Sequence, residues 1–484
     1  MTTAPLSFPT GSHVDGAWLE EGDARPDINP SRLTDVVGQF FSGTLDTVDA
    51  AVDAARAAQP AWARASPEFR SDVLARASAE LESRAGELGA LLAREEGKTR
   101  AEAVGEVNRA ARILRYFSGE AVRLTGERVA STRPGVLVDV VREPVGVVGL
   151  VTPWNFPIAI PAWKIAPALA YGNTVVLKPA DLVPASACAL MDILQRAGLP
   201  PGVLNLVLGP GRTVGDHLVR HPGIDAVSFT GSQAVGRRIA AQATERLARV
   251  QLEMGSKNPL VVAADAPLDQ AVQIAVEGAF YSTGQRCTAS SRLIVDASIH
   301  DRFVEAMTTR MGELVVGDAL DERTDIGPVV DRRQLDSNLA HLDDVRRRAG
   351  VSIIGGELVD DARIGHFMRP ALVLGTDNDD PINRTEVFGP IATVLRADDY
   401  DHALALANDS EYGLCSGICT RSLSLAEHFK ANSAAGMVMV NLPTAGVDYH
   451  VPFGGRRGSS YGPREQGSYA REFFTAVKTS YVRP

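Results

Sequence analysis

Apolar residues recur with a helical period over the first quarter of the chain. A pattern of small apolar residues begins after Thr44 and predicts a helix that ends at Pro60. A second pattern begins near Pro67 and predicts a long amphipathic helix that Gly97 ends. Its apolar face is formed by Leu74, Leu81, Leu88 and Leu92. This part of the chain is therefore predicted to be mostly helical.

A third helical pattern follows Gly97 and carries three arginines away from its apolar face. That face is formed by Val104, Val107, Ala111 and Leu114. The arginines are Arg109, Arg112 and Arg115. Charges on such a face are usually solvated, so the pattern alone predicts that all three point to solvent.

From residue 135 the pattern changes to strands, which then alternate with helices. Short apolar runs at 145–151, 174–177, 204–208, 226–229 and 250–252 are separated by helical patterns at 163–171, 185–197, 215–220 and 233–243. This alternation predicts an α/β fold with a parallel sheet that helices cover on both faces. Ligands of such sheets bind beyond the carboxyl ends of the strands, so a site is expected in the loops there.

A second alternating region extends from about residue 263 to 407, and a last strand is predicted at 473–481. This strand is too short to pack alone, so it is expected to pair with another chain. The chain has no low-complexity segment and no repeat of fixed period. Its 484 residues are too many for one simple core, and the length suggests two or three domains.

Composition excludes several classes of protein. The content of 45% hydrophobic and 22% charged residues is typical of a globular enzyme. A net charge of -10 argues against nucleic acid as the main partner, since such partners demand a basic surface. No apolar run is long enough to span a bilayer, and the N-terminus has no signal-peptide pattern. We expect a cytoplasmic protein that contacts neither nucleic acid nor membrane.

The four cysteines are too few and too scattered for a disulfide framework. They are Cys188, Cys287, Cys415 and Cys419. Two of them are close enough in sequence to resemble a metal-binding pair, but no second pair and no histidine cluster accompanies them. We therefore expect no metal site.

Cys287 is the first candidate for chemistry. It lies between the turn Gly284-Gln285-Arg286 and the run of small residues Thr288-Ala289-Ser290-Ser291. Small neighbours leave room for a substrate at the sulfur, and the preceding arginine favours the thiolate, which is the nucleophilic form. A free cysteine is more often buried and structural, so this stretch alone leaves both interpretations open.

A glycine turn that opens a helix is a candidate nucleotide site. The sequence Phe229-Thr230-Gly231-Ser232-Gln233 ends a predicted strand. Free N–H groups at a helix N-terminus can hold a pyrophosphate. The chain has no Gly-x-Gly-x-x-Gly fingerprint, so this turn alone does not identify a nucleotide site.

Nine short motifs occur in order between residues 153 and 467. They are Pro153-Trp154-Asn155-Phe156-Pro157, Trp163-Lys164, Lys178-Pro179-Ala180-Asp181, Phe229-Thr230-Gly231-Ser232, Leu252-Glu253-Met254-Gly255-Ser256-Lys257-Asn258-Pro259, Gly284-Gln285-Arg286-Cys287, Glu386-Val387-Phe388-Gly389-Pro390, Pro452-Phe453-Gly454-Gly455 and Arg464-Glu465-Gln466-Gly467. This set resembles the aldehyde dehydrogenase superfamily over essentially the whole chain. Its most specific part is Gly284-Gln285-x-Cys287 with Glu253 upstream.

The resemblance implies an aldehyde dehydrogenase-like fold with three parts. A Rossmann-like, parallel-sheet NAD(P)-binding domain would use residues 1–121 and 145–254. An α/β catalytic domain would span residues 255–470. A β oligomerisation arm would use residues 122–144 and 471–484, and the subunit would form a homodimer or a homotetramer.

The resemblance also implies how the chemistry is shared among residues. Cys287 would attack the aldehyde and form a thiohemiacetal, which hydride loss converts into a thioester. The Asn155 side chain and the Cys287 backbone N–H would stabilise the oxyanion. Glu253 would be the base that activates water for thioester hydrolysis. Lys164 and Glu465 match residues of a proton path behind that base, although they could equally form a structural ion pair.

Several positions match the family's cofactor site. Lys178 would contact the adenine ribose, Gly231 and Ser232 would lie beside the pyrophosphate, and Glu386 and Phe388 would hold the nicotinamide end. Thr152, Pro153 and Trp154 would complete the site. A carboxylate at Asp181 would repel a 2′-phosphate, so NAD is favoured over NADP.

Segments near the C-terminus resemble the branch that oxidises α-ketoglutaric semialdehyde (2,5-dioxopentanoate). They are Asn441-Leu442-Pro443-Thr444-Ala445-Gly446-Val447-Asp448-Tyr449-His450 and Tyr461-Gly462-Pro463-Arg464-Glu465-Gln466-Gly467. A substrate with a carboxylate favours an arginine, which binds it in a bidentate fork, and Arg109 and Arg286 are the candidates. The remaining candidate substrate residues are Phe156, Trp163, Tyr281 and Phe453. Neutral aliphatic or aromatic aldehydes remain open.

Two further interpretations remain. One is an acylating relative that transfers the acyl group to coenzyme A, but such relatives tend to lack the base, so Glu253 argues against it. The other is a non-catalytic member with a structural or binding role, which the presence of Cys287, Glu253 and Asn155 argues against.

Overall fold

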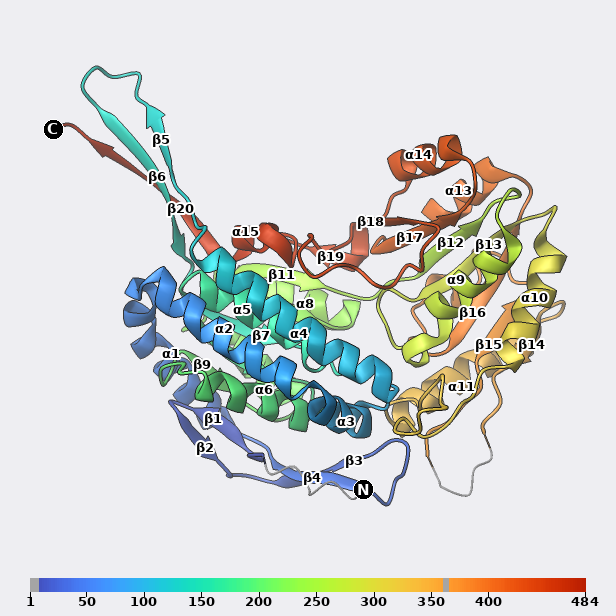
Figure 1. Ribbon diagram of the computed structural model, residues 1–484, viewed down its shortest axis with the longest axis horizontal. Helices are drawn as coiled ribbons and strands as arrows, with labels where there is room; N and C mark the ends of the chain where they lie inside the picture. The colour runs from blue at the N-terminus through green and yellow to red at the C-terminus, as the bar shows by residue number, and fades with distance from the viewer. Residues whose placement is uncertain (1–7, 360–364) are drawn as a thin grey trace.

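Two sheets covered by helices form most of the molecule (Figure 1). The structure is a computed structural model that describes residues 8–359 and 365–484. The first sheet has the strand order β19 (Ser460–Tyr461), β11 (Arg249–Glu253), β10 (Ala226–Thr230), β7 (Val147–Val151), β8 (Thr174–Lys178), β9 (Leu204–Leu206), β1 (Ser12–Val14) and β2 (Ala17–Leu19). The strands from β11 to β9 run parallel, whereas the edge strands pair antiparallel.

Helices cover both faces of this sheet. One face packs against α1 (Leu45–Arg64), α7 (Asp216–Arg220) and α8 (Gln233–Glu245). The other packs against α2 (Pro67–Ser83), α3 (Ala85–Glu96), α4 (Arg100–Ala121), α5 (Ala159–Ala170) and α6 (Pro184–Arg196). Neighbouring strand residues point to opposite faces, so Val147 belongs to the first core and Val148 to the second. The α/β fold predicted from the alternation is confirmed.

The second sheet has the order β14 (Ser352–Gly355), β15 (Ala371–Leu374), β16 (Ile391–Ala397), β13 (Ser290–Asp296), β12 (Asn258–Val262), β17 (Cys415–Cys419) and β18 (Met437–Val440). All of its pairs are parallel except β14 with β15. Helices α9 (Leu268–Phe280) and α10 (His300–Gly312) contribute to a core on one face, and α13 (Tyr400–Asn408) and α14 (Leu423–Asn432) to a core on the other. Helix α11 (Arg332–Arg346) and the short α12 (Pro381–Arg384) join a third core with β15.

A third sheet extends away from the body of the molecule (Figure 1). It consists of β20 (Thr475–Val482), β6 (Leu137–Pro144) and β5 (Glu127–Ala130), all antiparallel. The predicted C-terminal strand therefore exists and pairs with β6 of its own chain. Several apolar side chains on this sheet are exposed, namely Val129, Leu137, Val141, Val477, Tyr481 and Val482.

The remaining elements are short. Strand β3 (Ala24–Ile28) pairs with β4 (Val36–Phe41) as a separate hairpin. Helix α15 (Arg471–Phe474) precedes the C-terminal strand, and helical turns lie at Gly211–Gly215, Tyr281–Gly284, Arg457–Ser459 and Gly467–Ala470. Among the described helices, none is long and apolar enough to cross a membrane.

Two predicted helix boundaries are wrong. Helix α1 continues past Pro60 to Arg64, because Trp62 in its last turn packs into the core. The long helix predicted from Pro67 is two helices, which meet at Arg84 with backbone angles of φ -103° and ψ 12°. Leu81 and Leu88 are still buried in the same core on either side of the break. The periodicity therefore predicted the buried positions correctly, but it did not predict the break.

Candidate active site

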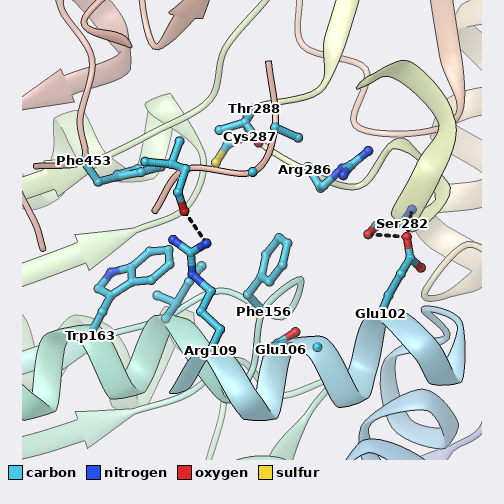
Figure 2. Close-up of a pocket in the computed structure, with 15 residues that line it drawn as sticks. Glu102, Glu106, Arg109, Phe156, Trp163, Ser282, Arg286, Cys287, Thr288 and Phe453 are labelled. Carbon is cyan, nitrogen blue, oxygen red and sulfur yellow. Dashed lines mark hydrogen bonds between the residues drawn. The ribbon is translucent and has the colours of Figure 1, made fainter. Parts of the chain in front are cut away.

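Cys287 lies where two cavities meet. One cavity, of about 250 Å³, is lined by residues of α4 and α5 and by the loops around residues 282–288 and 445–453 (Figure 2). The other, of about 270 Å³, lies at the carboxyl ends of the first sheet's strands. Because the sulfur borders both, a molecule in either cavity can approach it.

A strained turn places Cys287 at this junction. Ser282 and Thr283 have φ values of 53° and 56°, a region that β-branched residues such as threonine rarely adopt. The Ser282 backbone N–H and hydroxyl both donate to Glu102 Oε1, at 2.7 and 3.0 Å. A Cβ at Gly284 would lie 2.2 Å from the Gly389 oxygen, so only glycine fits there. Backbone strain of this kind is typical of functional sites.

Burial and neighbouring carboxylates keep Cys287 protonated. Burial, Glu386 and Glu253 raise the pKa of its thiol far above the usual value, and its own backbone N–H opposes them. The guanidinium of Arg286 donates instead to the Glu277 carbonyl at 2.5 Å. Arg286 still interacts favourably with the charge of the Cys287 thiolate, as expected, but burial and the two carboxylates outweigh it. The thiol therefore needs a base before it can attack.

Asn155 and Glu253 approach the cysteine from the strand ends of the first sheet. Asn155 lines the second cavity together with Cys287, and its Nδ2 donates to the Gln285 carbonyl at 2.9 Å. Glu253 ends β11, is buried, and accepts a hydrogen bond of 2.6 Å from the Ser460 hydroxyl. Burial, followed by the charge of Glu465, raises the pKa of Glu253 well above the usual carboxyl value.

Lys164 and Glu465 form a buried ion pair. Lys164 also donates to the Ser228 hydroxyl at 2.7 Å, and the Trp163 indole N–H donates to the other oxygen of Glu465 at 2.7 Å. Glu465 is close enough to Glu253 to raise its pKa. The arrangement satisfies the ion pair within the core, and its use as a proton path stays a prediction.

The second cavity brings together six of the predicted cofactor residues. They are Pro153, Trp154, Gly231, Ser232, Glu386 and Phe388. The rings of Trp154 and Phe388 meet edge to face with centroids 5.3 Å apart. The Ser256 backbone N–H donates to Glu386 at 2.8 Å, yet burial raises the pKa of Glu386 to about 7.

The other three predicted cofactor residues lie outside this cavity, at the end of β8 and beside it. Lys178 Nζ forms an ion pair of 2.8 Å with Asp181, and burial lowers the pKa of Lys178. The Thr152 backbone N–H donates to the Lys178 carbonyl at 3.1 Å, and its buried hydroxyl has no hydrogen-bond partner. Asp181 borders a separate, small cavity that Arg25 also lines.

Five of the six predicted substrate residues line the first cavity. They are Arg109, Phe156, Trp163, Arg286 and Phe453. Arg109 is a correction to the helical pattern, which placed it in solvent. Figure 2 shows the Arg109 side chain among the residues that line the cavity. Its guanidinium donates to the Val447 carbonyl and to Gln466. Arg112 and Arg115 are exposed, as predicted.

Tyr281 is not among the residues that line the first cavity. Its side chain packs against the core of the second sheet, because the strained turn directs the next residue, Ser282, towards Glu102 instead.

Sequence reasoning missed Glu102 and Glu106, which line this cavity from α4. Only Glu102 carried a local signal, because Thr99 and Glu102 form a capping box at the start of that helix. Among the described residues, no group of three His, Cys, Asp or Glu side chains could hold a metal ion.

Comparison with known proteins agrees with this geometry. Residues 18–480 match the model of the aldehyde dehydrogenase family. The chain is 41% identical to an alpha-ketoglutaric semialdehyde dehydrogenase of Bacillus subtilis (strain 168), over 97% of each chain. It is 42% identical to an alpha-ketoglutarate semialdehyde dehydrogenase of Haloferax volcanii, over 98% of this chain and 99% of the other.

A solved structure gives the same result for the fold. Betaine aldehyde dehydrogenase from Staphylococcus aureus, in complex with NAD+, superposes with a TM-score of 0.96 at 31% identity, over 98% of this chain and 95% of that one. The family match over residues 18–480 includes Cys287, Glu253 and Asn155. The chain therefore belongs to the aldehyde dehydrogenase family.

Proposed function

We propose that the protein oxidises an aldehyde that carries a carboxylate, such as α-ketoglutaric semialdehyde, with NAD as the preferred cofactor. The observation that supports this most is the position of Cys287 between the two cavities. An aldehyde in the first cavity and a nicotinamide in the second can then both reach the same sulfur centre.

The residues of the second cavity fit the nicotinamide end of a dinucleotide. Trp154 and Phe388 offer aromatic surface, and Glu386 offers a carboxylate for ribose hydroxyls. Ser232 is the N-cap of α8 and makes no side-chain cap hydrogen bond, so the first turn of this helix offers backbone N–H groups to a phosphate. The N–H of Gly231 itself donates to the Glu253 carbonyl at 3.0 Å. Lys178 and Asp181 would meet the other end. Bound there, the nicotinamide supplies the hydride acceptor for the aldehyde.

The protein's own residues divide the remaining chemistry. Glu253 takes the proton of the Cys287 thiol, and the sulfur then bonds to the aldehyde carbon. The Asn155 amide and the Cys287 backbone N–H donate to the resulting oxyanion. Once the hydride has left, a thioester remains at Cys287. Glu253 first releases the thiol proton to solvent and then removes a proton from the water that hydrolyses the thioester. Cleavage of the carbon–sulfur bond releases the carboxylate product, and the Cys287 thiolate regains a proton to complete the cycle.

Arg109 is the proposed anchor for the substrate carboxylate. Both Arg109 and Arg286 line the first cavity and have a buried Nε without a hydrogen-bond partner. The centre of the Trp163 ring lies 5.9 Å from the Arg109 guanidinium carbon. The two terminal nitrogens of Arg109 donate to the Val447 carbonyl and to Gln466 Oε1. Arg286 is tied back to Glu277. Arg109 therefore presents a fixed charge to the cavity, and the relatives named for α-ketoglutaric semialdehyde support the same substrate class.

A neutral aldehyde is the second candidate, because Phe156, Ile160, Trp163 and Phe453 make much of the lining apolar. The two candidates separate in an assay of cofactor reduction. The panel contains α-ketoglutaric semialdehyde, succinic semialdehyde, betaine aldehyde, benzaldehyde and simple alkanals, each tested with NAD and with NADP. We expect the highest kcat/KM for the semialdehyde acids with NAD, and none with Cys287→Ala.

The same assay contains the results that would contradict the proposal. A preference for neutral aldehydes would leave the reaction but discard the acidic substrate. Higher efficiency with NADP would overturn the proposed role of Asp181. Formation of an acyl thioester when coenzyme A is added, in place of the free acid, would identify an acylating enzyme. No reduction with any aldehyde would leave a binding role.

A further inference from the structure

Lys98 and Glu106 form a buried ion pair next to the backbone of Asn155. Lys98 Nζ is 2.6 Å from Glu106 Oε2, and each side chain is at most 1% exposed. Lys98 precedes α4 and Glu106 lies within it, so the pair is fixed by the start of one helix. Burial alone would lower the pKa of Lys98, but Glu106 and Glu96 raise it above the usual value. Lys98 is therefore a permanent positive charge inside the protein.

Both members of this pair hold the segment that carries Asn155. Lys98 Nζ donates to the Asn155 backbone carbonyl at 2.7 Å and lies 3.9 Å from the centre of the Phe156 ring. Glu106 Oε1 accepts from the backbone N–H groups of Ile158 and Ala159, at 2.9 and 3.0 Å. Residues 155–159 are thus fixed at both ends by one ion pair.

The desolvation cost of burying Lys98 and Glu106 suggests that the pair is kept for the position of the groups it holds. Two charges removed from water are stabilised only when their geometry and hydrogen bonds are complete, and apolar residues of similar volume often serve stability equally well. An oxyanion donor, by contrast, must lie within a few tenths of an ångström of its place to be effective. The ion pair fixes the backbone from which the Asn155 amide extends, so it meets that requirement.

We propose that Lys98 and Glu106 are positioning residues that hold the backbone of Asn155 where its amide reaches the oxyanion formed at Cys287. The inference rests on the proposed roles of Asn155 and Cys287. Glu106 also borders the first cavity, but its carboxylate is used by Lys98 and by the backbone N–H groups of Ile158 and Ala159, so we infer that the pair acts on the reaction through Asn155.

The test compares Lys98→Met with the matched control Glu96→Gln. Glu96 Oε2 lies 3.9 Å from Lys98 Nζ and accepts a hydrogen bond from the Lys98 backbone N–H. In the described part of the chain, the Glu96 side chain forms no hydrogen bond or ion pair with residues 155–159. Burial raises the pKa of Glu96 to about 8, so an amide there changes the charge little near neutral pH. We expect kcat to fall roughly 10- to 100-fold in Lys98→Met, the range for a displaced oxyanion donor, and less than about twofold in the control.

Two readouts separate positioning from a general loss of structure. Alkylation of Cys287 by iodoacetamide forms no oxyanion, so its rate should not change in Lys98→Met. Hydrolysis of an activated ester passes through an oxyanion, so its rate should fall with kcat, and KM for NAD should stay constant. Parallel loss of alkylation and ester hydrolysis would overturn the proposal, as would a kcat within twofold of the wild type.

A double-mutant cycle with Asn155→Ala then tests the route of the effect. If Lys98 acts through Asn155, Lys98→Met should cost little more in a protein that already lacks the amide, whereas a full additional loss contradicts the inference. If Lys98→Met does not fold, Glu106→Gln replaces it. This variant keeps an oxygen for Ile158 and Ala159 but weakens the pairing with Lys98, and we expect a smaller loss with the same dependence on Asn155.

The cycle also distinguishes this inference from the proposed function. A large loss in Asn155→Ala together with an active Lys98→Met would reject the positioning role alone. Wild-type kcat in Asn155→Ala would reject the role of Asn155 in the reaction, and the positioning inference with it.

Discussion

Gly454 lies against the carboxylate of Glu253. A Cβ at position 454 would fall 2.7 Å from Glu253 Oε1 and 2.8 Å from the Arg464 side chain, and the backbone φ of 146° also disfavours a side chain. The proposed base therefore has room only because the residue beside it is glycine. The glycine of the motif Pro452-Phe453-Gly454-Gly455 therefore makes room for the buried carboxylate of Glu253.

Gly454→Ala should impair the reaction by displacing Glu253. We expect kcat to fall about tenfold or more, because a base must stay within hydrogen-bond reach of the proton it removes. Cofactor binding should persist. The matched control is Gly350→Ala, which has a similar backbone restriction, with φ of 80°, but nothing within 4 Å of the added Cβ. Equal kcat values in the two variants would contradict a steric effect on Glu253.

The raised pKa of Glu253 predicts how turnover depends on pH. Only the ionised carboxylate can activate water, and burial and Glu465 keep this carboxyl protonated to a higher pH than usual. We expect kcat to rise with pH from the mildly acidic into the alkaline range. Glu253→Gln should remove this rise and lower kcat by roughly a hundredfold or more. A wild-type profile that is flat between about pH 6 and pH 9 would contradict the assignment.

The same group predicts how stability depends on pH. In the unfolded chain Glu253 ionises near the usual carboxyl pKa, whereas in the folded protein it ionises at higher pH. Between these values the folded state binds more protons, so the free energy of unfolding falls as pH rises. Glu253→Gln cannot ionise and should lack its share of that decline, which is about 1.4 kcal/mol for each unit of pKa difference.

Thermal unfolding measures this effect directly. We expect Glu253→Gln to gain Tm relative to the wild type at about pH 8.5. The gain should shrink near pH 5, where position 253 is uncharged in both folded proteins and the unfolded wild type is close to its own carboxyl pKa. Glu427→Gln, which replaces an exposed carboxylate, serves as the control for a change of net charge. A larger gain at low pH than at high pH would reverse the sign and reject the linkage.

The local sequence predicted the elements of this site better than their contacts. Glu253 ends a strand of the parallel sheet, where a site was expected. The turn before Cys287 instead follows helix α9, and only its motif marked it as part of the site. The hydrogen bond between Arg109 and Val447, however, joins residues 338 positions apart, and no helical period contains that information. Periodicity placed Arg109 away from the apolar face of α4, and only the second sheet's loops make that side a cavity wall.

Arg109 should determine the preference for acidic aldehydes. A hydrogen bond to a charged group contributes about 1.5–3 kcal/mol, so Arg109→Met should raise KM for α-ketoglutaric semialdehyde by roughly 10- to 100-fold. KM for a neutral alkanal should change little. Arg109→Lys should recover only part of the loss, because it lacks the bidentate fork. Arg112→Met, one turn further and exposed, is the control.

Arg109→Met also removes the hydrogen bond to the Val447 carbonyl, and this loss alone predicts a different result from loss of the carboxylate anchor. If Arg109 only holds the loop at residues 445–450, Arg109→Met should raise KM for neutral and acidic aldehydes alike. A selective loss for the acidic substrate in Arg286→Met, with Arg109→Met unaffected, would move the anchor to Arg286.

The arm formed by β20, β6 and β5 should control assembly. Val477 and Tyr481 lie on the same side of β20, since side chains repeat with a period of two along a strand, and they are 58% and 60% exposed. Apolar surface on a strand that projects from the subunit is typical of an interface with another copy. We expect the wild type to form a dimer or a tetramer, and the double variant Val477→Glu/Tyr481→Glu to shift it towards the 51.5 kDa monomer.

Light scattering measures the mass of the assembly. The control is Lys478→Gln, which lies on the opposite side of the strand and should leave the assembly intact. A wild type that is monomeric at all concentrations would reject the arm as an interface, whereas an intact oligomer of the double variant would place the interface elsewhere.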